Sequence, residues 1–219
     1  MARCSCRAGA RRSLAGRGRL ADLASGLRSA RGGAKVSLVL PTAYTELPRG
    51  AAGTLATLGI MAKLAVDAVH DPETGAEFVW WARAIVKRCA SKAYLDELDA
   101  LYRFVRQTVR YRLDPHRLER VQAPYWTLTV DGAGDCDDSS ALLAALALAV
   151  GHGAILRAVA VDPDRPGSYS HVYPLLGAVV QGEEVWLGAD ATQKNRPLGW
   201  EPPRTRWSAE PLDLIVALP

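Results

Sequence analysis

The chain has 219 residues, of which 49% are hydrophobic and 23% are charged, as is usual for a globular protein, and this composition excludes collagen, a coiled coil and disorder throughout. The net charge is +4, but residues 1–35 carry +8 and the rest of the chain carries −4. An acidic body is not typical of a nucleic-acid-binding domain. Nucleic acid is therefore an expected partner only through the basic N-terminal segment, whose arginines could also touch an acidic protein.

The four cysteines are Cys4, Cys6, Cys89 and Cys136, and they form no C-x-x-C pair and no zinc-finger spacing. We therefore expect no metal, no cofactor and a reducing compartment, the cytoplasm of a bacterium or of a phage-infected host, with a virion as the alternative. The basic N-terminus lacks the apolar stretch of a secretory signal and leaves a transit peptide as a minor alternative. The longest strongly apolar run, residues 141–150, is half a membrane span, so no membrane partner is expected.

We predict a disordered basic tail over residues 1–35 and a single domain over 36–219, whose first part, 36–112, is helical. Residues 36–40 read as a short extended entry stopped by Pro41. Apolar side chains recur at helical spacing in three segments, and Thr54 is a plausible N-cap for the first. The three predicted helices cover about residues 54–70, 73–90 and 95–111.

The second part of the domain, 113–219, has a different pattern. Residues 113–135 show no sustained period and predict a long ordered loop, with a short extended piece near 126–130. A helix over 137–150 is apolar nearly all round and therefore buried. Three strand-like runs follow, at residues 154–161, 169–180 and 183–189, and Gln181-Gly182 joins the last two as a hairpin. From residue 197 the Pro- and Trp-rich chain is expected to pack across the surface of this α+β domain.

Three residues stand where a cysteine enzyme would need them. Cys136 begins the buried helix in Gly134-Asp135-Cys136-Asp137-Asp138, His171 lies on the next sheet, and Asp190 ends the following strand. A helix N-terminus favours the thiolate that attacks a carbonyl and offers N–H groups to the oxyanion that forms. An imidazole takes up the thiol proton, and a carboxylate orients the imidazole.

The strand pattern is consistent with a contact between the last two residues. His171 shares one strand face with Tyr169 and Tyr173, and Asp190 shares one with Trp186. If the hairpin turns at Gln181-Gly182, Asp190 lies opposite a residue near 173, within one register step of His171. A slip by one residue would place the carboxylate on the wrong face.

The ordered set of Gly134-Asp135-Cys136, Ser170-His171-Val172 and the segment Trp186 to Thr192 resembles the transglutaminase-like superfamily of cysteine enzymes. The resemblance covers roughly residues 110–195. Together with Tyr111-x-x-Asp114-Pro115 and the Leu-rich helix, the Gly-Asp-Cys-Asp-Asp form looks most like the small transglutaminase-like proteins of phages and prophages, whose structural proteins would then be possible partners.

This resemblance implies a papain-like core and acyl transfer through a thioester, with Cys136 as nucleophile, His171 as acid and base, and Asp190 as its orienter. A protein or peptide substrate is implied, with water as acceptor in an amidase or peptidase and an amine in a cross-linking enzyme. The family's second oxyanion donor is often a side chain upstream of the cysteine. The candidates for oxyanion or substrate binding are the side chains of Trp126, Gln122, Asp137 and Tyr169.

Other interpretations remain open at each position. Cys136 could be an inert core thiol, His171 a hydrogen-bonded strand histidine, and Asp190 a turn former. The acidic residues around Cys136 should raise the pKa of its thiol, which favours a non-catalytic virion or assembly protein that uses the cleft for binding. The three residues together could also form a metal site, although zinc takes a fuller nitrogen and sulfur set. An EF-hand is excluded, because its glycine and glutamate positions are not matched.

Overall fold

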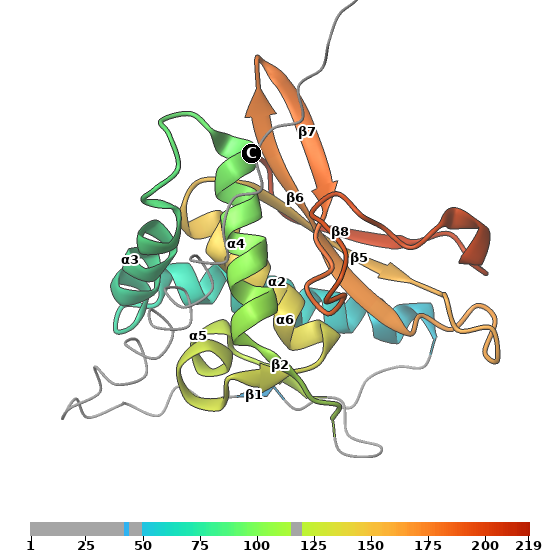
Figure 1. Ribbon diagram of the computed structural model, residues 1–219. Coiled ribbons are helices and arrows are strands. Elements are labelled where there is room, and N and C mark those ends of the chain that lie inside the picture. The colour runs from blue at the N-terminus through green and yellow to red at the C-terminus, as the bar shows by residue number, and fades with distance from the viewer. Residues whose placement is uncertain (1–41, 44–49, 115–119) are drawn as a thin grey trace, which may run out of the picture.

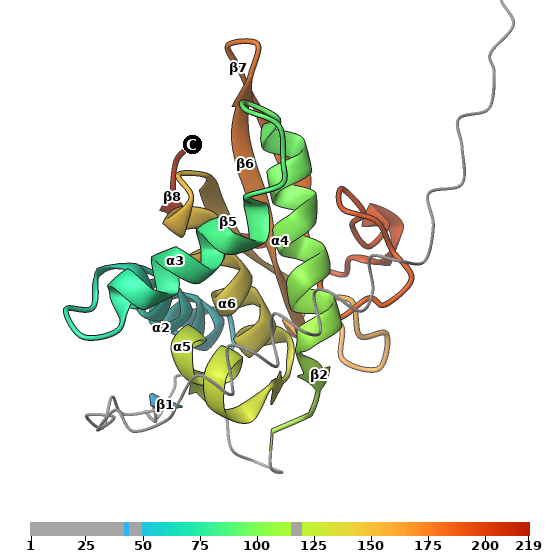
Figure 2. The same ribbon diagram turned by 60° about the vertical axis from the view of Figure 1, so that its left-hand side comes forward.

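The computed structural model describes residues 42–43, 50–114 and 120–219, so the predictions for residues 1–35 and 36–40 lie outside the described residues. Helices gather on one side of a four-stranded sheet, and the sheet extends beyond them as a long hairpin (Figures 1 and 2). This is the mixed α+β architecture with an antiparallel sheet that the sequence predicts.

Among the described residues, three long helices precede the cysteine-bearing helix, as predicted. The first begins earlier than expected: Gly50, not Thr54, is its N-cap residue, with φ +69°. The Thr54 hydroxyl instead donates to the carbonyl of Gly50 within the first turn. The three helices are α2 (Ala51–His70), α3 (Gly75–Val86) and α4 (Tyr94–Thr108).

Helix α2 is long and apolar enough to cross a membrane by length and composition alone. In this fold its apolar face, with Leu58, Met61 and Ala65 fully buried, lies against the core instead. The core is completed by aromatic side chains of α3 and α4. The largest of them are Phe78, Trp81, Tyr102 and Phe104.

The centre of the domain is α6 (Cys136–Ala149), in which nearly every side chain is buried. Its alanines and leucines allow close packing against α2, α3, α4 and the sheet at the same time. The helix ends where Gly151 takes a positive φ of 87°, in the Gly-His-Gly segment that predicts the stop. Burial on all sides fixes where its first residue, Cys136, stands relative to the sheet.

Residues 120–135 are more regular than predicted. The extended piece expected at 126–130 is wrong: the chain coils there into a short helix followed by a π-helical turn that Gly132 ends with φ +61°. Short strand pairs hold the two ends of this segment, since β1 pairs with β3 and β2 runs parallel to β4. These elements are β1 (Thr42–Ala43), β2 (Arg110–Tyr111), β3 (Val121–Gln122), α5 (Pro124–Trp126), η2 (Thr127–Asp131) and β4 (Ala133–Gly134).

The sheet has the strand order β7-β6-β5-β8, and all its pairs are antiparallel. Its fourth strand lies in the C-terminal segment, where the sequence predicts only packing across the surface. The proline and tryptophan residues that precede this strand favour irregular structure, so its alternating pattern is not recognised as a strand. The 3₁₀ turn η3 (Arg204–Arg206) precedes it. The strands are β5 (Gly153–Val159), β6 (His171–Val180), β7 (Glu183–Gly188) and β8 (Leu212–Ala217).

The β6–β7 hairpin has the predicted turn and register. Gln181 and Gly182 both adopt positive φ, 55° and 87°, and Val180 pairs with Glu183, as in a tight two-residue hairpin. The register continues to the end of the hairpin, where the Ala189 N–H donates to the carbonyl of Pro174. Position 190 therefore lies next to the first residues of β6.

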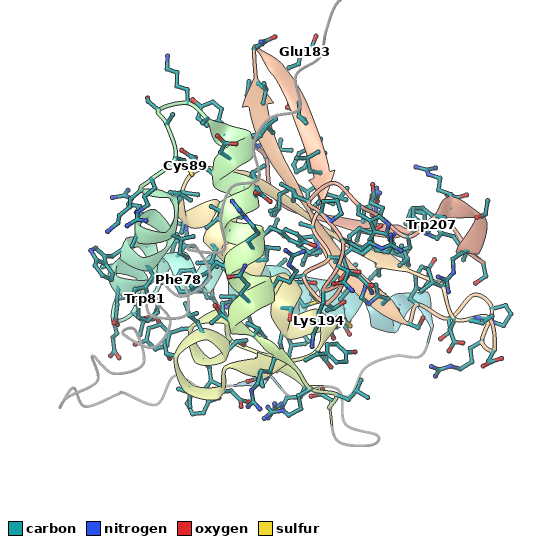
Figure 3. All side chains as sticks on the ribbon, viewed as in Figure 1. Phe78, Trp81, Cys89, Glu183, Lys194 and Trp207 are labelled. Atoms are coloured by element: carbon teal, nitrogen blue, oxygen red, sulfur yellow. The ribbon has the colours of Figure 1, made fainter. Side chains whose placement is uncertain are left out.

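A second apolar layer covers the face of the sheet opposite α6. Trp186 lies flat over two glycines of this face, so that a Cβ on Gly177 would be 2.5 Å from its ring and one on Gly153 would be 2.9 Å away. Arg157 of β5 bonds Glu201 and Asp213 there and lies over the Trp207 ring. Figure 3 shows Trp207 on the far side of the sheet from the side chains of α3.

Candidate active site

Three separate elements supply the predicted site residues. Cys136 is the first residue of α6, His171 is the first residue of β6, and Asp190 follows the end of β7. The structure brings the histidine and the aspartate together, with 2.7 Å between His171 Nε2 and Asp190 Oδ2. An ionised carboxylate only accepts hydrogen bonds, so Nε2 carries the ring hydrogen and Nδ1 keeps a lone pair for a proton.

Asp190 is held firmly behind the histidine. Its side chain is almost completely buried, and its Oδ1 accepts from the backbone N–H and the hydroxyl of Thr192. The Tyr102 hydroxyl donates to the Asp190 carbonyl. The carboxylate therefore has one defined orientation toward His171, which a group that fixes the tautomer of an imidazole needs.

Cys136 and His171 line the same cleft, with a volume of about 510 Å³. A stripe of α2 that includes Thr54, Thr57 and Met61 lines it, together with the end of β2 and the loop before β6. A substrate lying in this cleft would meet the sulfur and the imidazole on one surface.

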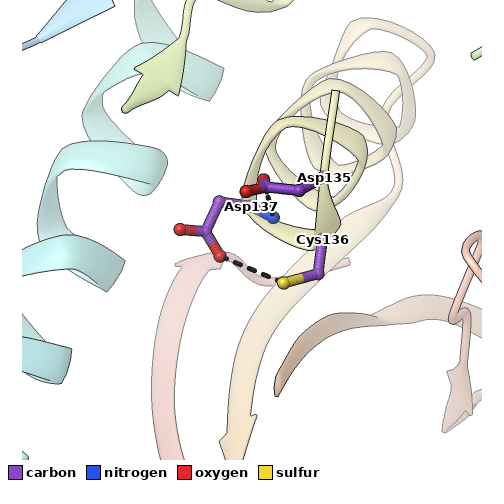
Figure 4. A group of neighbouring side chains, drawn as sticks. All are labelled: Asp135, Cys136 and Asp137. Atoms are coloured by element: carbon purple, nitrogen blue, oxygen red, sulfur yellow. Dashed lines mark hydrogen bonds between the residues drawn. The ribbon is translucent and has the colours of Figure 1, made fainter. Parts of the chain in front are cut away.

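The sulfur of Cys136 lies 3.5 Å from Asp137 Oδ1, with which the thiol forms a hydrogen bond (Figure 4). Burial is the main cause that raises the pKa of this thiol well above its ordinary value, and the charges of Asp137 and Asp135 raise it further. A hydrogen bond from the backbone N–H of Val172 acts in the opposite direction and ties the sulfur to the residue that follows His171. These effects favour the protonated thiol over the thiolate.

Asp135 and Asp138 cap the helix that carries the cysteine. The Asp135 side chain accepts from the backbone N–H groups of Asp137 and Asp138, while the Asp138 carboxylate accepts from the Asp135 N–H in a reciprocal capping box. Burial and the neighbouring Asp138 raise the pKa of Asp135 to about 7. The Ser139 N–H donates to the Asp135 carbonyl. In this first turn, the backbone N–H of Cys136 is therefore the one that has no acceptor among the residues that the structure describes.

The four predicted oxyanion or substrate residues lie in two places. Asp137 and Tyr169 line the cleft, and the Tyr169 hydroxyl donates to the Glu210 carbonyl. Gln122 is completely buried behind the cleft, where its amide donates to Asp138 and Ala133. Trp126, in the helical turn after β3, is not among the residues that line the cleft either. These last two side chains therefore do not line the cleft that contains Cys136 and His171.

A different side chain, that of Tyr111, lines the cleft instead. In the sequence, only the family resemblance singles this residue out. Tyr111 pairs with Gly134 in the β2–β4 ladder, two residues before the cysteine, and lines the cleft. Burial is the main cause that raises the pKa of its hydroxyl to about 12, and the ionisable groups of Cys136 and Asp135 beside it raise it further, so the group is a hydrogen-bond donor at neutral pH. Only the pairing of two very short strands places it there, and that pairing leaves no periodic signal in the sequence.

Asp135, Cys136 and Asp137 also bring three possible metal-ligand atoms within 4.8 Å of one another. They are consecutive in the chain, so their proximity is local. Asp135 is already used as the helix cap. No further nitrogen or sulfur ligand joins them among the described residues, so the set does not resemble a zinc site.

Comparison with known proteins agrees with the geometry. Residues 79–186 match the family model described as the transglutaminase-like superfamily. No curated protein matches the chain. Solved structures that resemble it include a "putative cysteine protease" of Cytophaga hutchinsonii, at 17% identity and TM-score 0.40 over 55% of this chain and 38% of that one.

A second solved structure, a "putative protease" of Parabacteroides distasonis, aligns at 13% identity and TM-score 0.41 over 59% of this chain and 26% of that one. The chain therefore spans less than half the length of either protein. The matched segment contains α4, α6, His171 and most of the sheet. Over residues 79–186 the chain is therefore similar to the transglutaminase-like superfamily.

Proposed function

We propose that the chain is a cysteine-dependent enzyme that transfers an acyl group from a carboxamide or peptide bond through a thioester on Cys136. The observation that supports this most is the 2.7 Å hydrogen bond from His171 to Asp190 at the edge of a cleft that also contains the Cys136 sulfur. A buried strand histidine with only a structural role would not need a fixed carboxylate on one nitrogen and a cleft on the other side.

The first step begins from the neutral thiol. Cys136 Sγ attacks the substrate carbonyl carbon while its proton moves to Nδ1 of His171, and the carbonyl π electrons move onto the oxygen. Since the thiol has a raised pKa, proton transfer accompanies the attack rather than preceding it as a stable thiolate–imidazolium pair. Asp190 stabilises the imidazolium that forms.

The oxyanion of the tetrahedral intermediate needs donors at the sulfur. We assign this role to the Cys136 backbone N–H and to the Tyr111 hydroxyl, in place of Trp126 and Gln122. The intermediate then collapses: the C–N bond breaks, and His171 gives its proton to the leaving nitrogen. Water or an amine attacks the thioester in turn and loses a proton to His171, which returns it to the departing sulfur.

An activated ester tests the thioester without knowledge of the natural substrate. The full chain is mixed with p-nitrophenyl acetate, and p-nitrophenolate release and the mass of the Cys136 peptide are followed. We expect one acetyl group on Cys136, no such adduct in Cys136→Ala, and acetylation at least about 100-fold slower in His171→Ala. Cys89→Ala serves as the matched control, because this thiol lies outside the cleft, and its acetylation of Cys136 should equal that of wild type.

The second candidate function is that of a binding or assembly protein which keeps the fold but not the chemistry. The observation that favours it is the pair of carboxylates, Asp135 and Asp137, which oppose ionisation of the thiol. Acetylation of Cys136 no faster than that of Cys89 in the folded protein, and unchanged by His171→Ala, would support this function and contradict the enzymatic one. Added n-butylamine would separate aminolysis from hydrolysis if acetylation is seen.

A further inference from the structure

Directly behind the cysteine, two fully buried polar side chains bond each other. Asp138 Oδ1 accepts from the Gln122 backbone N–H at 2.7 Å, and Asp138 Oδ2 accepts from Gln122 Nε2 at 2.6 Å. Neither side chain has any exposed surface. Asp138 is two residues after Cys136 in the first turn of α6, while Gln122 belongs to β3, so the contact joins two separate elements.

The same pair also holds the strand that leads into the helix. Gln122 Nε2 donates a second bond, 3.2 Å long, to the Ala133 carbonyl of β4. The Asp138 carboxylate lies so close to Gly134 that a Cβ there would be 2.4 Å from its Oδ2. Since Gly134 pairs with Tyr111 of β2, one carboxylate links the start of α6 with β3 and, through β4, with the strand that carries the tyrosine of the cleft.

Two buried polar side chains at these positions are less favourable for stability than well-packed apolar ones would be. Burial raises the pKa of Asp138, and the two bonds from Gln122 act against that rise. Gln122 Oε1 is buried and has no partner among the described residues, so the amide uses both donor contacts and leaves its acceptor unsatisfied, which costs stability. Buried polar pairs of this kind contribute little net stability, and a specific geometry is one reason for a fold to keep one.

We propose that the Asp138–Gln122 pair is a positioning device, which holds the first turn of α6 against β3 and β4 so that the Cys136 sulfur stays aligned with His171 and Tyr111. This inference rests on the proposed function. Neither side chain touches the reacting atoms, and the sulfur is displaced when the pair is broken. A displacement of about 1 Å in a site of this kind can reduce a rate 100-fold.

Gln122→Met tests the pair, because methionine approximates the length of glutamine and removes both bonds that Nε2 donates, to Asp138 and to Ala133, while the bond from the backbone N–H to Asp138 stays. Glu97→Gln is the matched control: it weakens the partly buried contact of His152 with Glu97, 2.8 Å long, just beyond the opposite end of α6, about 20 Å from Cys136 along the helix. Both variants are examined at a temperature where circular dichroism shows them fully folded. The limiting rate of Cys136 acetylation, the half-saturating ester concentration and amide hydrogen exchange of residues 135–138 are measured.

We expect a limiting rate at least about 10-fold lower in Gln122→Met with an unchanged half-saturating concentration, faster exchange at residues 135–138, and neither effect in Glu97→Gln. An unchanged limiting rate in Gln122→Met overturns the positioning role and leaves the proposed function intact. If wild type itself shows no acetylation of Cys136, the proposed function fails, and hydrogen exchange alone decides the pair. If amide exchange at residues 135–138 is faster in Gln122→Met alone, the result supports the proposal that the Asp138–Gln122 pair fixes the start of α6. Equal exchange in wild type and both variants overturns that proposal.

Discussion

Replacing Asp137 by Asn should lower the pKa of the Cys136 thiol, because the Asp137 carboxylate lies beside the sulfur and opposes its ionisation. The distance from Sγ to Oδ1 is 3.5 Å. Two unit charges at this distance interact with about 1.2 kcal/mol in water and about 4.7 kcal/mol at an effective dielectric constant of 20. One pKa unit corresponds to about 1.4 kcal/mol, so the expected fall lies between about 1 and 3 units.

The assay is the rate of iodoacetamide labelling at Cys136 as a function of pH, read by mass spectrometry of the Cys136 peptide. Cys89 is an internal reference in the same digest, because its pKa is raised by its own burial and by the charge of Glu97, with no contribution from Asp137. Asp67→Asn is the matched variant, since it removes one carboxylate from the exposed face of α2. It should leave the Cys136 profile unchanged.

Two results would refute the reasoning. A Cys136 midpoint within about 0.3 units of wild type in Asp137→Asn would show that this carboxylate does not control the thiol. An equal shift at Cys89 would show that the effect is a general change in the fold. A shift at Cys136 alone supports a resting thiol whose proton is retained by Asp137 until a substrate carbonyl arrives.

Three further changes test other parts of the site and fold. Asp190→Asn keeps a hydrogen-bond acceptor for the histidine but removes its charge, so acetylation by p-nitrophenyl acetate should slow at least about 100-fold, measured by p-nitrophenolate release. Asp135→Asn keeps the helix cap and removes a carboxyl whose pKa rises from 3.8 unfolded to about 7 folded. The folded state binds this proton more tightly than the unfolded state, so the free energy of unfolding of wild type rises as pH falls from 8 to 4. In urea unfolding, the free energy of unfolding of the variant should exceed that of wild type by at most about 4 kcal/mol above pH 7 and should equal it near pH 4. Gly177→Ala places a methyl group 2.5 Å from the Trp186 ring and should lower the unfolding free energy by about 1–3 kcal/mol, whereas Gly59→Ala, with open space around it, should raise it by about 0.5–1 kcal/mol.

The parts of the fold that follow a local period could be predicted from the sequence. The four long helices and the β6–β7 hairpin are confirmed, because apolar spacing and a Gln-Gly turn carry their signal within the segment itself. That hairpin register in turn predicts the contact of His171 with Asp190, which the structure shows at 2.7 Å. The contact between these two residues could be predicted because a single turn, Gln181-Gly182, sets the register of both strands.

What the sequence could not provide depends on contacts between short, separate pieces. The amide of Gln122 looks like an oxyanion donor in the sequence but is used by Asp138, and the position of Tyr111 follows from a two-residue parallel pairing. The sequence does not predict the strand β8, because proline and tryptophan precede its pattern, and among the described residues it takes its register from β5 alone. Pairings of this length become defined only when the whole core is assembled.

The order of the strands has a consequence for synthesis on the ribosome. β5 is made well before β8, so one edge of β5 remains without its partner while β6, β7 and the long connection emerge, a delay of several seconds at ~5–20 residues per second. An open apolar edge invites pairing with other chains. Arg157 lies in the middle of that edge and later pairs directly with Asp213 of β8. Its charge therefore opposes pairing of the open edge with other chains before β8 is made, and its ion pair with Asp213 favours the native register of β8 afterwards.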